Sequence, residues 1–528
     1  MFDYNTIQDL PKSLPLFQRF HFQSEFATRL DQFVLHYKGD MISSIRVKFP
    51  LGNEHRDAID RLISKGIAKG AKRIELLFSS ETNDTTHSIL PYKFSLTLLS
   101  DNDSLTYLHL QNCLVLEPMN LSGLKNLRTL VFHLVDVKQK LLQSLSSNCS
   151  HLLDFTLDDC HFTSSLIINI PTLLRLNIVN CRVNIERYID IIASNLSSFE
   201  YSCNDRFRVH PINIKSHMLS KFIYRGARFS KPIGFFGLKN VTTIVLDGLT
   251  ENLSGNILNN LFSDCFKLEN ATFKNCCLTS STDITSQKLR HLSIIDCGFG
   301  EYSPYAITID ALNLLSFEYS GQNTHIIYVT APKLLKIFWN AAVREKIPHP
   351  FGPIESLPHI ENLAMIIYPS QVEKLKQVLF QFQNLRQLEL FVEGGVYDLD
   401  MNYFWILDII TASQHLQKIS ITIRNRHLKN SRMVEFKREK RKYAEFSHND
   451  LKYVEFCGCV FSADVIELAS QLLRNANSLN KMTFSSLHKF YIGAGRWTSG
   501  SDGCLLGQNV IYEMLKDEVN KQCQLIIL

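Results

Sequence analysis

A short apolar pattern recurs along this chain and limits the folds that it can adopt. In one clear copy, leucines stand at the first, fourth and sixth positions and a cysteine at the ninth, namely Leu105, Leu108, Leu110 and Cys113. The same spacing recurs at Leu152, Phe155, Leu157 and Cys160, at Leu173, Leu176, Ile178 and Cys181, at Leu268, Ala271, Phe273 and Cys276, and at Leu289, Leu292, Ile294 and Cys297. The fourth and sixth residues are two apart, so on a strand they point to one side and their neighbours point to the other. One copy cannot bury its apolar side alone, so successive copies must stack.

This spacing is that of a leucine-rich repeat. The first positions of successive copies are Leu105, Leu127, Leu152, Leu173, Leu196, Leu219, Val241, Leu268, Leu289, Leu314, Leu334, Ile360, Leu385, Leu416, Leu451 and Leu479. Their separations begin at 22, 25, 21, 23, 23 and 22 residues and later widen to 31 and 35, as in repeats with insertions. We therefore predict an α/β leucine-rich-repeat solenoid, with a curved parallel sheet on the concave side and mixed helices and irregular turns on the convex side. In this register Leu176 points inward and Asn177 points outward.

The repeats predict a chain in three parts. Residues 1–104 carry degenerate repeats, with a strand expected at Phe17, Phe20 and Phe22 and a helix over residues 56–70. Residues 105–446 form the main solenoid with a basic insertion at 424–442, and residues 447–528 form C-terminal repeats and a cap. Helices are expected in the connections 137–147, 370–383, 402–412 and 463–476 and in the cap at 510–519, and a last strand at 525–528.

Composition and cysteine usage favour a folded protein of a reducing compartment. Hydrophobic residues make up 45% of the chain and charged residues 20%, which is too apolar for a disordered chain. Five of the thirteen cysteines close a repeat, where a reduced thiol behaves as a small buried hydrophobe. The sequence shows neither a secretion signal nor a run of eighteen apolar residues. We expect reduced cysteines, no membrane partner, and a location in the cytoplasm, the nucleus or both.

Enzyme motifs are missing from the sequence. It contains no G-x-S-x-G, H-E-x-x-H, G-x-x-x-x-G-K or G-x-G-x-x-G. Gly493, Gly495 and Trp497 come nearest to a glycine-rich phosphate loop, but the third glycine is lacking, so we expect a turn there. The sequence therefore predicts a protein that is not an enzyme and needs no cofactor or metal.

Three stretches carry a resemblance to a known family. Residues 29–39 read RLDQFVLHYKG, residues 42–49 read ISSIRVKF, and residues 451–459 read LKYVEFCGC. In this order they resemble plant F-box proteins that carry irregular leucine-rich repeats and a C-terminal FBD-type region. The resemblance implies the substrate-recognition part of a ubiquitin-ligase receptor, in which an F-box docks on the Skp-type adaptor of a cullin ligase.

The family's F-box pattern is not found ahead of these stretches. Asp9, Leu10 and Pro11 resemble the motif that opens an F-box, but the leucine- and isoleucine-rich helices and the tryptophan-containing end that should follow are absent. Two expectations stay open. In the first, the sequence is a truncated product or gene model, and adaptor and cullin binding require an F-box supplied upstream. Otherwise it is an adaptor-independent scaffold or competitor that binds a protein target without recruiting a ligase.

The concave face is the expected binding surface, because the outward residues of successive strands align there. The candidate partner-binding residues are Arg175, Asn177, Lys221, Arg225, Asp247, Lys274, Lys336 and Phe338. The basic members together with Phe338 would suit an acidic or amphipathic protein. A merely hydrated sheet face is the alternative.

A second candidate is the basic insertion. Residues 424–442 hold nine Lys or Arg and two Glu, so this segment's net charge of +7 exceeds the +5 of the whole chain. Its densest part is formed by Lys437, Arg438, Lys440, Arg441 and Lys442. It could serve nuclear import, meet an anionic partner, or simply form a solvated loop. Sites for single-stranded nucleic acid interleave such charge with aromatic residues, and only Phe436 and Tyr443 are near, so nucleic acid is not the expected partner.

Overall fold

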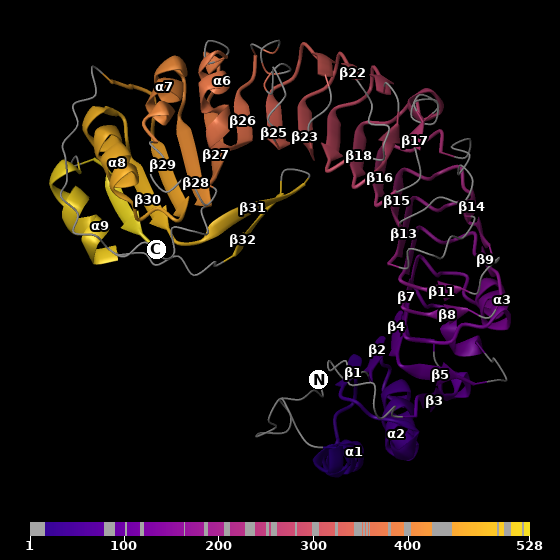
Figure 1. Cartoon of the computed structure of the whole chain (residues 1–528). Helices are drawn as coiled ribbons and strands as arrows, with labels where there is room; N and C mark the ends of the chain where they lie inside the picture. Colours follow the sequence, from indigo (N-terminus) through magenta and orange to yellow (C-terminus); the bar gives the residue numbers. More distant parts are fainter. Residues whose placement is uncertain are drawn as a thin grey trace. The chain divides into compact units, whose positions relative to one another are not determined.

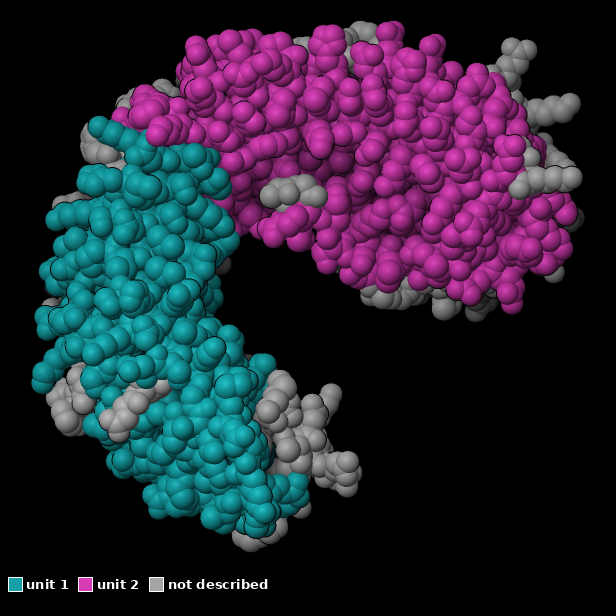
Figure 2. Space-filling view, turned by 180° about the vertical axis from the view of Figure 1, so that it is seen from behind, with its two compact units in different colours: residues 1–244 teal, residues 245–528 magenta. Residues whose placement is uncertain are grey.

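The computed structural model describes residues 16–78, 90–100, 103–116, 121–162, 164–183, 188–204, 212–226, 238–249, 253–254, 261–279, 282–297, 306–322, 326–342, 351, 354, 357, 359–378, 382–394, 403–424, 446–493, 496–500, 508–519 and 522–528. The chain divides into two compact units, Met1–Ile244 (unit 1) and Val245–Leu528 (unit 2), which Figure 2 colours separately.

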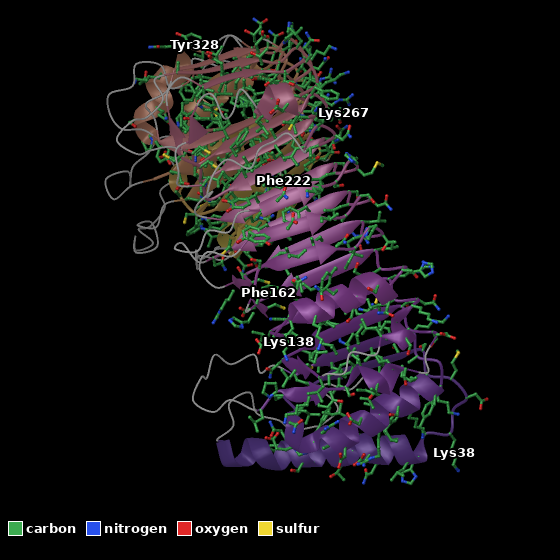
Figure 3. All side chains as sticks on the ribbon, turned by 90° about the vertical axis from the view of Figure 1, so that its right-hand side faces the viewer. Lys38, Lys138, Phe162, Phe222, Lys267 and Tyr328 are labelled. Atoms are coloured by element: carbon green, nitrogen blue, oxygen red, sulfur yellow. The ribbon has the colours of Figure 1, made fainter. Side chains whose placement is uncertain are left out.

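Unit 1 is built on a parallel sheet with one strand from each repeat. In the sheet each strand pairs with the next along β1 (Ser44–Lys48), β2 (Arg73–Leu77), β4 (Tyr107–Gln111), β6 (Thr129–His133), β7 (Asp154–Asp158), β10 (Arg175–Val179), β13 (Ser198–Cys203) and β15 (Lys221–Gly226). Figure 3 shows these strands following one another.

The connections of unit 1 return behind this sheet (Figure 1). They contain α1 (Leu16–His36), α2 (Arg56–Ala68), α3 (Gln139–Asn148), the 3-10 turns η2 (Asn53–His55), η3 (Leu96–Leu99) and η4 (Ser122–Leu124), and the short paired strands β3 (Tyr92–Phe94) with β5 (Cys113–Val115), β8 (His161–Phe162) with β11 (Arg182–Val183), and β9 (Leu166–Asn169) with β12 (Ile189–Ile192) and β14 (Ile212–Lys215). The core lies between the sheet and these connections; Phe222 in β15, labelled in Figure 3, is fully buried there, and its ring centroid lies 5.8 Å from that of Phe199.

Unit 2 repeats the same construction. In its parallel sheet each strand again pairs with the next along β18 (Asn270–Lys274), β21 (His291–Ile295), β23 (Ser316–Gln322), β25 (Lys336–Ala342), β26 (Asn362–Ile367), β27 (Gln387–Glu393), β28 (Lys418–Arg424), β29 (Tyr453–Gly458), β30 (Lys481–Ser485) and β33 (Gln524–Ile527). The boundary between the units falls within β16 (Thr243–Asp247).

The connections of unit 2 change character along the chain. The earlier ones carry β17 (Leu253–Ser254) paired with β19 (Leu278–Thr279), and β20 (Thr282–Thr285) with β22 (Ala306–Asp310) and β24 (Ile326–Thr330). The later ones carry η6 (Pro369–Gln371), α6 (Val372–Lys376), α7 (Trp405–Ala412), α8 (Ala463–Asn475), α9 (Gln508–Leu515) and η9 (Lys516–Glu518). An antiparallel hairpin, β31 (His488–Gly493) and β32 (Arg496–Gly500), forms a separate two-stranded sheet that is not hydrogen-bonded into the main sheet.

The predicted register is confirmed throughout. All sixteen first positions are buried, at most 4% exposed, and a strand of the main sheet begins two residues after each. Leu176 is fully buried, whereas Asn177 is only partly covered. The predicted fold class, a parallel-sheet leucine-rich-repeat solenoid with mixed connections, is therefore the observed one.

In several repeats the eighth position has a left-handed backbone. Asn112, Asp159, Asn180, Asn275 and Asp296 have φ between 47° and 55°, and Gly248 and Gly458 occupy the same place with φ of 82° and 83°. This conformation lets the N–H at that position donate to the next repeat, as from Asn112 to the His133 carbonyl at 2.9 Å. Asn, Asp and Gly tolerate it, which explains why they stand there.

The ninth position supports the same turn through its thiol. Cys181 Sγ donates to the carbonyl oxygens of Leu157 in the preceding strand and Val179 in its own, at 3.3 and 3.4 Å. Cysteine thiols also donate hydrogen bonds to backbone carbonyl oxygens at Cys113, Cys160, Cys276 and Cys297. All five are buried and free, as expected. The general expectation of reduced cysteines fails at Cys459, which is disulfide-bonded.

The predicted strand at Phe17, Phe20 and Phe22 is wrong, because these residues belong to the helix α1. Phe22, Phe26, Leu30 and Phe33 stand three or four apart, which is the helical period, and the partial strand pattern overlaps it. The helix expected over 370–383 is shorter, being η6 followed by α6. The predicted helices at 56–70, 137–147, 402–412 and 463–476 are confirmed as α2, α3, α7 and α8, and the last strand as β33. The domain bounds 1–104, 105–446 and 447–528 stay a prediction.

Candidate protein-interaction surface

The outward side chains of unit 1 form three parallel rows, which we call the accessible face of unit 1. The first row is Ser44, Arg73, Tyr107, Thr129, Asp154, Arg175, Ser198 and Lys221; the second is Arg46, Glu75, His109, Val131, Thr156, Asn177, Glu200 and Ile223; the third is Lys48, Leu77, Gln111, His133, Asp158, Val179, Ser202 and Arg225. All residues of the first row are exposed or partly exposed. The parallel register fixes which side chains are neighbours.

Opposite charges on this face lie on adjacent strands. Arg175 Nε is 2.5 Å from Asp154 Oδ1, and Arg225 NH1 pairs with Glu200 Oε1. Between them Asn177 Nδ2 donates to Thr156 Oγ1 at 3.2 Å. We call these contacts the lattice of paired side chains. Arg175 and Arg225 are each paired with an acidic neighbour, so they do not form the free basic patch that the sequence suggests.

A denser cluster lies at the start of the sheet. Glu75, 5% exposed, pairs with Arg46 at 2.9 Å and with Arg73, whose guanidinium carbon lies 3.5 Å from the ring centroid of Tyr107. On the next strand burial lowers the pKa of His109 to about 4, so this imidazole is neutral at neutral pH. The cluster presents an aromatic ring, an imidazole and fixed guanidinium groups side by side.

The face of unit 2 is different because the hairpin β31–β32 lies against it (Figure 1). Phe338, which sequence reasoning offered as a partner contact, is 5% exposed and stacks on Tyr491 of β31 with ring centroids 3.7 Å apart. Phe391 stacks on Trp497 of β32 at 4.6 Å. Phe338 thus contacts the chain's own hairpin in this structure.

Comparison with known families agrees with this architecture. A family model described as the At1g61320/AtMIF1 leucine-rich-repeat domain matches residues 41–253 and 215–516. The chain belongs to this family. A comparison with curated proteins found no match. The domain type supports a role in protein binding, while the F-box and FBD features stay a prediction.

The remaining candidate residues in this member of the At1g61320/AtMIF1 family are placed separately. Lys221 and Lys336 are exposed and Lys274 is partly exposed. Asp247 Oδ1 accepts a hydrogen bond from Asn275 Nδ2 at 2.9 Å, so it braces the turn of the next repeat. Lys437, Arg438, Lys440, Arg441 and Lys442 lie outside the described residues.

Sequence reasoning missed the acidic partners on the accessible face, although the register contained the signal. Asp154 stands directly opposite Arg175, and Glu200 lies one row from Arg225 on the adjacent strand. It also missed Arg46 and Glu75, because the repeats before Leu105 match the pattern only weakly. In the described part of the chain no group of acidic, histidine and cysteine residues could hold a metal, and no helix is long and apolar enough to cross a membrane.

Proposed function

We propose that the chain is a protein-recognition solenoid that binds its target on the accessible face of unit 1. The observation that carries this proposal is the lattice of paired side chains on that face. A side chain held by its neighbour, as Arg175 is by Asp154, loses little further freedom on binding, so its hydrogen-bonding capacity is available at low entropic cost. The mixed charges favour a polar partner surface with both signs of charge.

The finer proposal is that this solenoid is the substrate-recognition part of an F-box-type ubiquitin-ligase receptor. The resemblance of residues 29–49 and 451–482 to F-box proteins with an FBD-type region supports it. The chain then positions a bound protein for modification by other subunits and performs no chemistry itself, in the cytoplasm, the nucleus or both. The alternative is a scaffold or competitor that binds the same target without recruiting a ligase.

Binding on this face is tested by affinity purification with quantitative mass spectrometry. Lys221→Glu and Val131→Glu change exposed or partly exposed residues of the accessible face, and Lys140→Glu is a matched control on α3. The expected result is one set of proteins depleted by both face variants and retained by the control. Equal recovery with all three chains contradicts the proposal.

The ligase role is tested upstream of Met1. The 5′ end of the transcript is mapped, and any upstream sequence in the same frame is translated. A leucine-proline-opening helical module whose product binds a Skp-type adaptor supports the receptor. An in-frame stop codon directly upstream favours the scaffold or competitor.

A further inference from the structure

The hairpin β31–β32 is held on the face of unit 2 by its side chains. It forms a two-stranded antiparallel sheet of its own, with Phe490 opposite Thr498 and Tyr491 opposite Trp497. An isolated hairpin of this size is marginally stable in water, so its order depends on what it packs against.

The surface beneath the hairpin is apolar where an exposed sheet face would be polar. Ile295, Phe338, Ile366 and Phe391 all stand at outward positions of their strands, yet each is at most 9% exposed. Tyr491 and Trp497 pack against this cluster. The face therefore accepts aromatic side chains.

A carboxylate site lies beside this aromatic cluster. Lys489 Nζ lies 2.5 Å from Glu455 Oε2 and 3.0 Å from Ser420 Oγ, on β29 and β28. On the adjacent strand β27, burial raises the pKa of Glu389, which also faces this lysine. Lys489 thus contacts a glutamate and a hydroxyl on two strands, and Glu389 stands in register with both on the third strand.

Lys489 and Tyr491 are two residues apart in β31, so both side chains point to the sheet. Ile492, the next residue, points away and is 45% exposed. The bound pattern is therefore a strand with a lysine, an aromatic residue two positions later, and a second aromatic residue beside it. A partner segment with this pattern could displace the hairpin and make equivalent contacts with the sheet.

We propose that the face of unit 2 is a recognition surface for a lysine-and-aromatic β-segment of a partner protein, and that the chain's own hairpin occupies it as an intramolecular competitor. The covalent link gives the hairpin a high effective concentration, so a partner binds only when it is concentrated or when the hairpin is weakened. This inference concerns unit 2 and does not depend on binding at unit 1.

The test uses the full chain and a fluorescein-labelled synthetic peptide with the sequence of residues 488–500. Trp497→Ala in the chain weakens the hairpin's hold, whereas Thr498→Ala changes an exposed residue of the same strand and serves as the control. Fluorescence anisotropy should show saturable binding to the Trp497→Ala chain at least ten times tighter than to the wild-type or Thr498→Ala chain. Adding Glu455→Gln to the Trp497→Ala chain should weaken that binding about fivefold.

Circular dichroism confirms that each variant chain remains folded, and hydrogen exchange of the wild-type chain gives an independent readout. Amides of β31 and β32 should exchange through local opening, well before those of β28 and β29. Failure of the folded Trp497→Ala chain to bind the peptide, binding that Glu455→Gln does not weaken, or hairpin exchange only through global unfolding would each overturn the proposal.

Discussion

Lys489 of β31 and Glu455 of β29 form an ion pair of 2.5 Å that joins the hairpin to the sheet of unit 2. The hydrogen bonds and charge of Lys489 hold the pKa of Glu455 below its usual range, against the opposing effect of burial. A carboxyl with a depressed pKa in the folded state contributes stability above its unfolded pKa, and that contribution is lost as pH falls through the folded value.

This pair gives a prediction for Glu455→Gln. The variant should lose about 1 kcal/mol of hairpin stability at neutral pH, because the pair is partly exposed and screened by solvent. The difference from wild type should shrink as pH falls below the ordinary glutamate range. Hydrogen exchange of β31 amides at several pH values measures this difference in hairpin stability between the variant and the wild type. A difference independent of pH contradicts the role of this charge.

Leu134 is the strained member of the eighth-position series. Its φ is 54°, as for Asn112, but leucine disfavours this region and its side chain is 40% exposed. Leu134→Asn should therefore stabilise unit 1 by about 0.5–1 kcal/mol, because little apolar burial is lost. The reciprocal change Asn112→Leu should destabilise it by about 1 kcal/mol. Chemical denaturation measures both, and the same sign for the two changes would refute the explanation.

The register predicts a sharp contrast between two neighbouring residues of β10. Leu176→Asp should cost about 3 kcal/mol or more, because it buries an unpaired charge. Asn177→Asp, on the accessible face, should cost about 0.5 kcal/mol or less. Thermal unfolding of both variants measures the contrast, and equal losses are incompatible with the register.

The buried imidazole of His109 should make the stability of unit 1 sensitive to acid. Its pKa is lowered from 6.5 to about 4 by burial, so the unfolded chain binds the proton more readily between these values. Stability from this residue is complete above pH 6.5 and declines as pH falls toward 4, by up to about 3 kcal/mol. His109→Gln should flatten this part of the pH profile relative to wild type. An unchanged profile, or a His109 pKa near 6.5 by NMR, contradicts it.

The sequence predicted the repeats well because their signal is local and periodic. Each first leucine, such as Leu173, is followed two residues later by a strand, and the same short spacing decides which side chains are buried. In α1 the apolar residues fit two periods over a short stretch, so the sequence pattern predicts a strand at Phe22 although this residue lies in a helix.

The candidate site was less predictable because its contacts join distant residues. Tyr491 meets Phe338 through a hairpin that is not part of the repeat, so no period in the sequence links them. A signal nevertheless existed: Phe338, Ile366 and Phe391 are apolar at positions that the register turns outward. Such violations of the polar pattern mark a covered face.

The most direct test of the account is site-specific photo-crosslinking of the full chain in cells with p-benzoylphenylalanine. The probe is placed at Thr156 or Val131 on the accessible face, and at Gln143 on α3 as the control. The account predicts a discrete adduct of the same protein from Thr156 and Val131 and none of that protein from Gln143. The same adduct from all three positions, or from Gln143 alone, would contradict binding on the accessible face of unit 1.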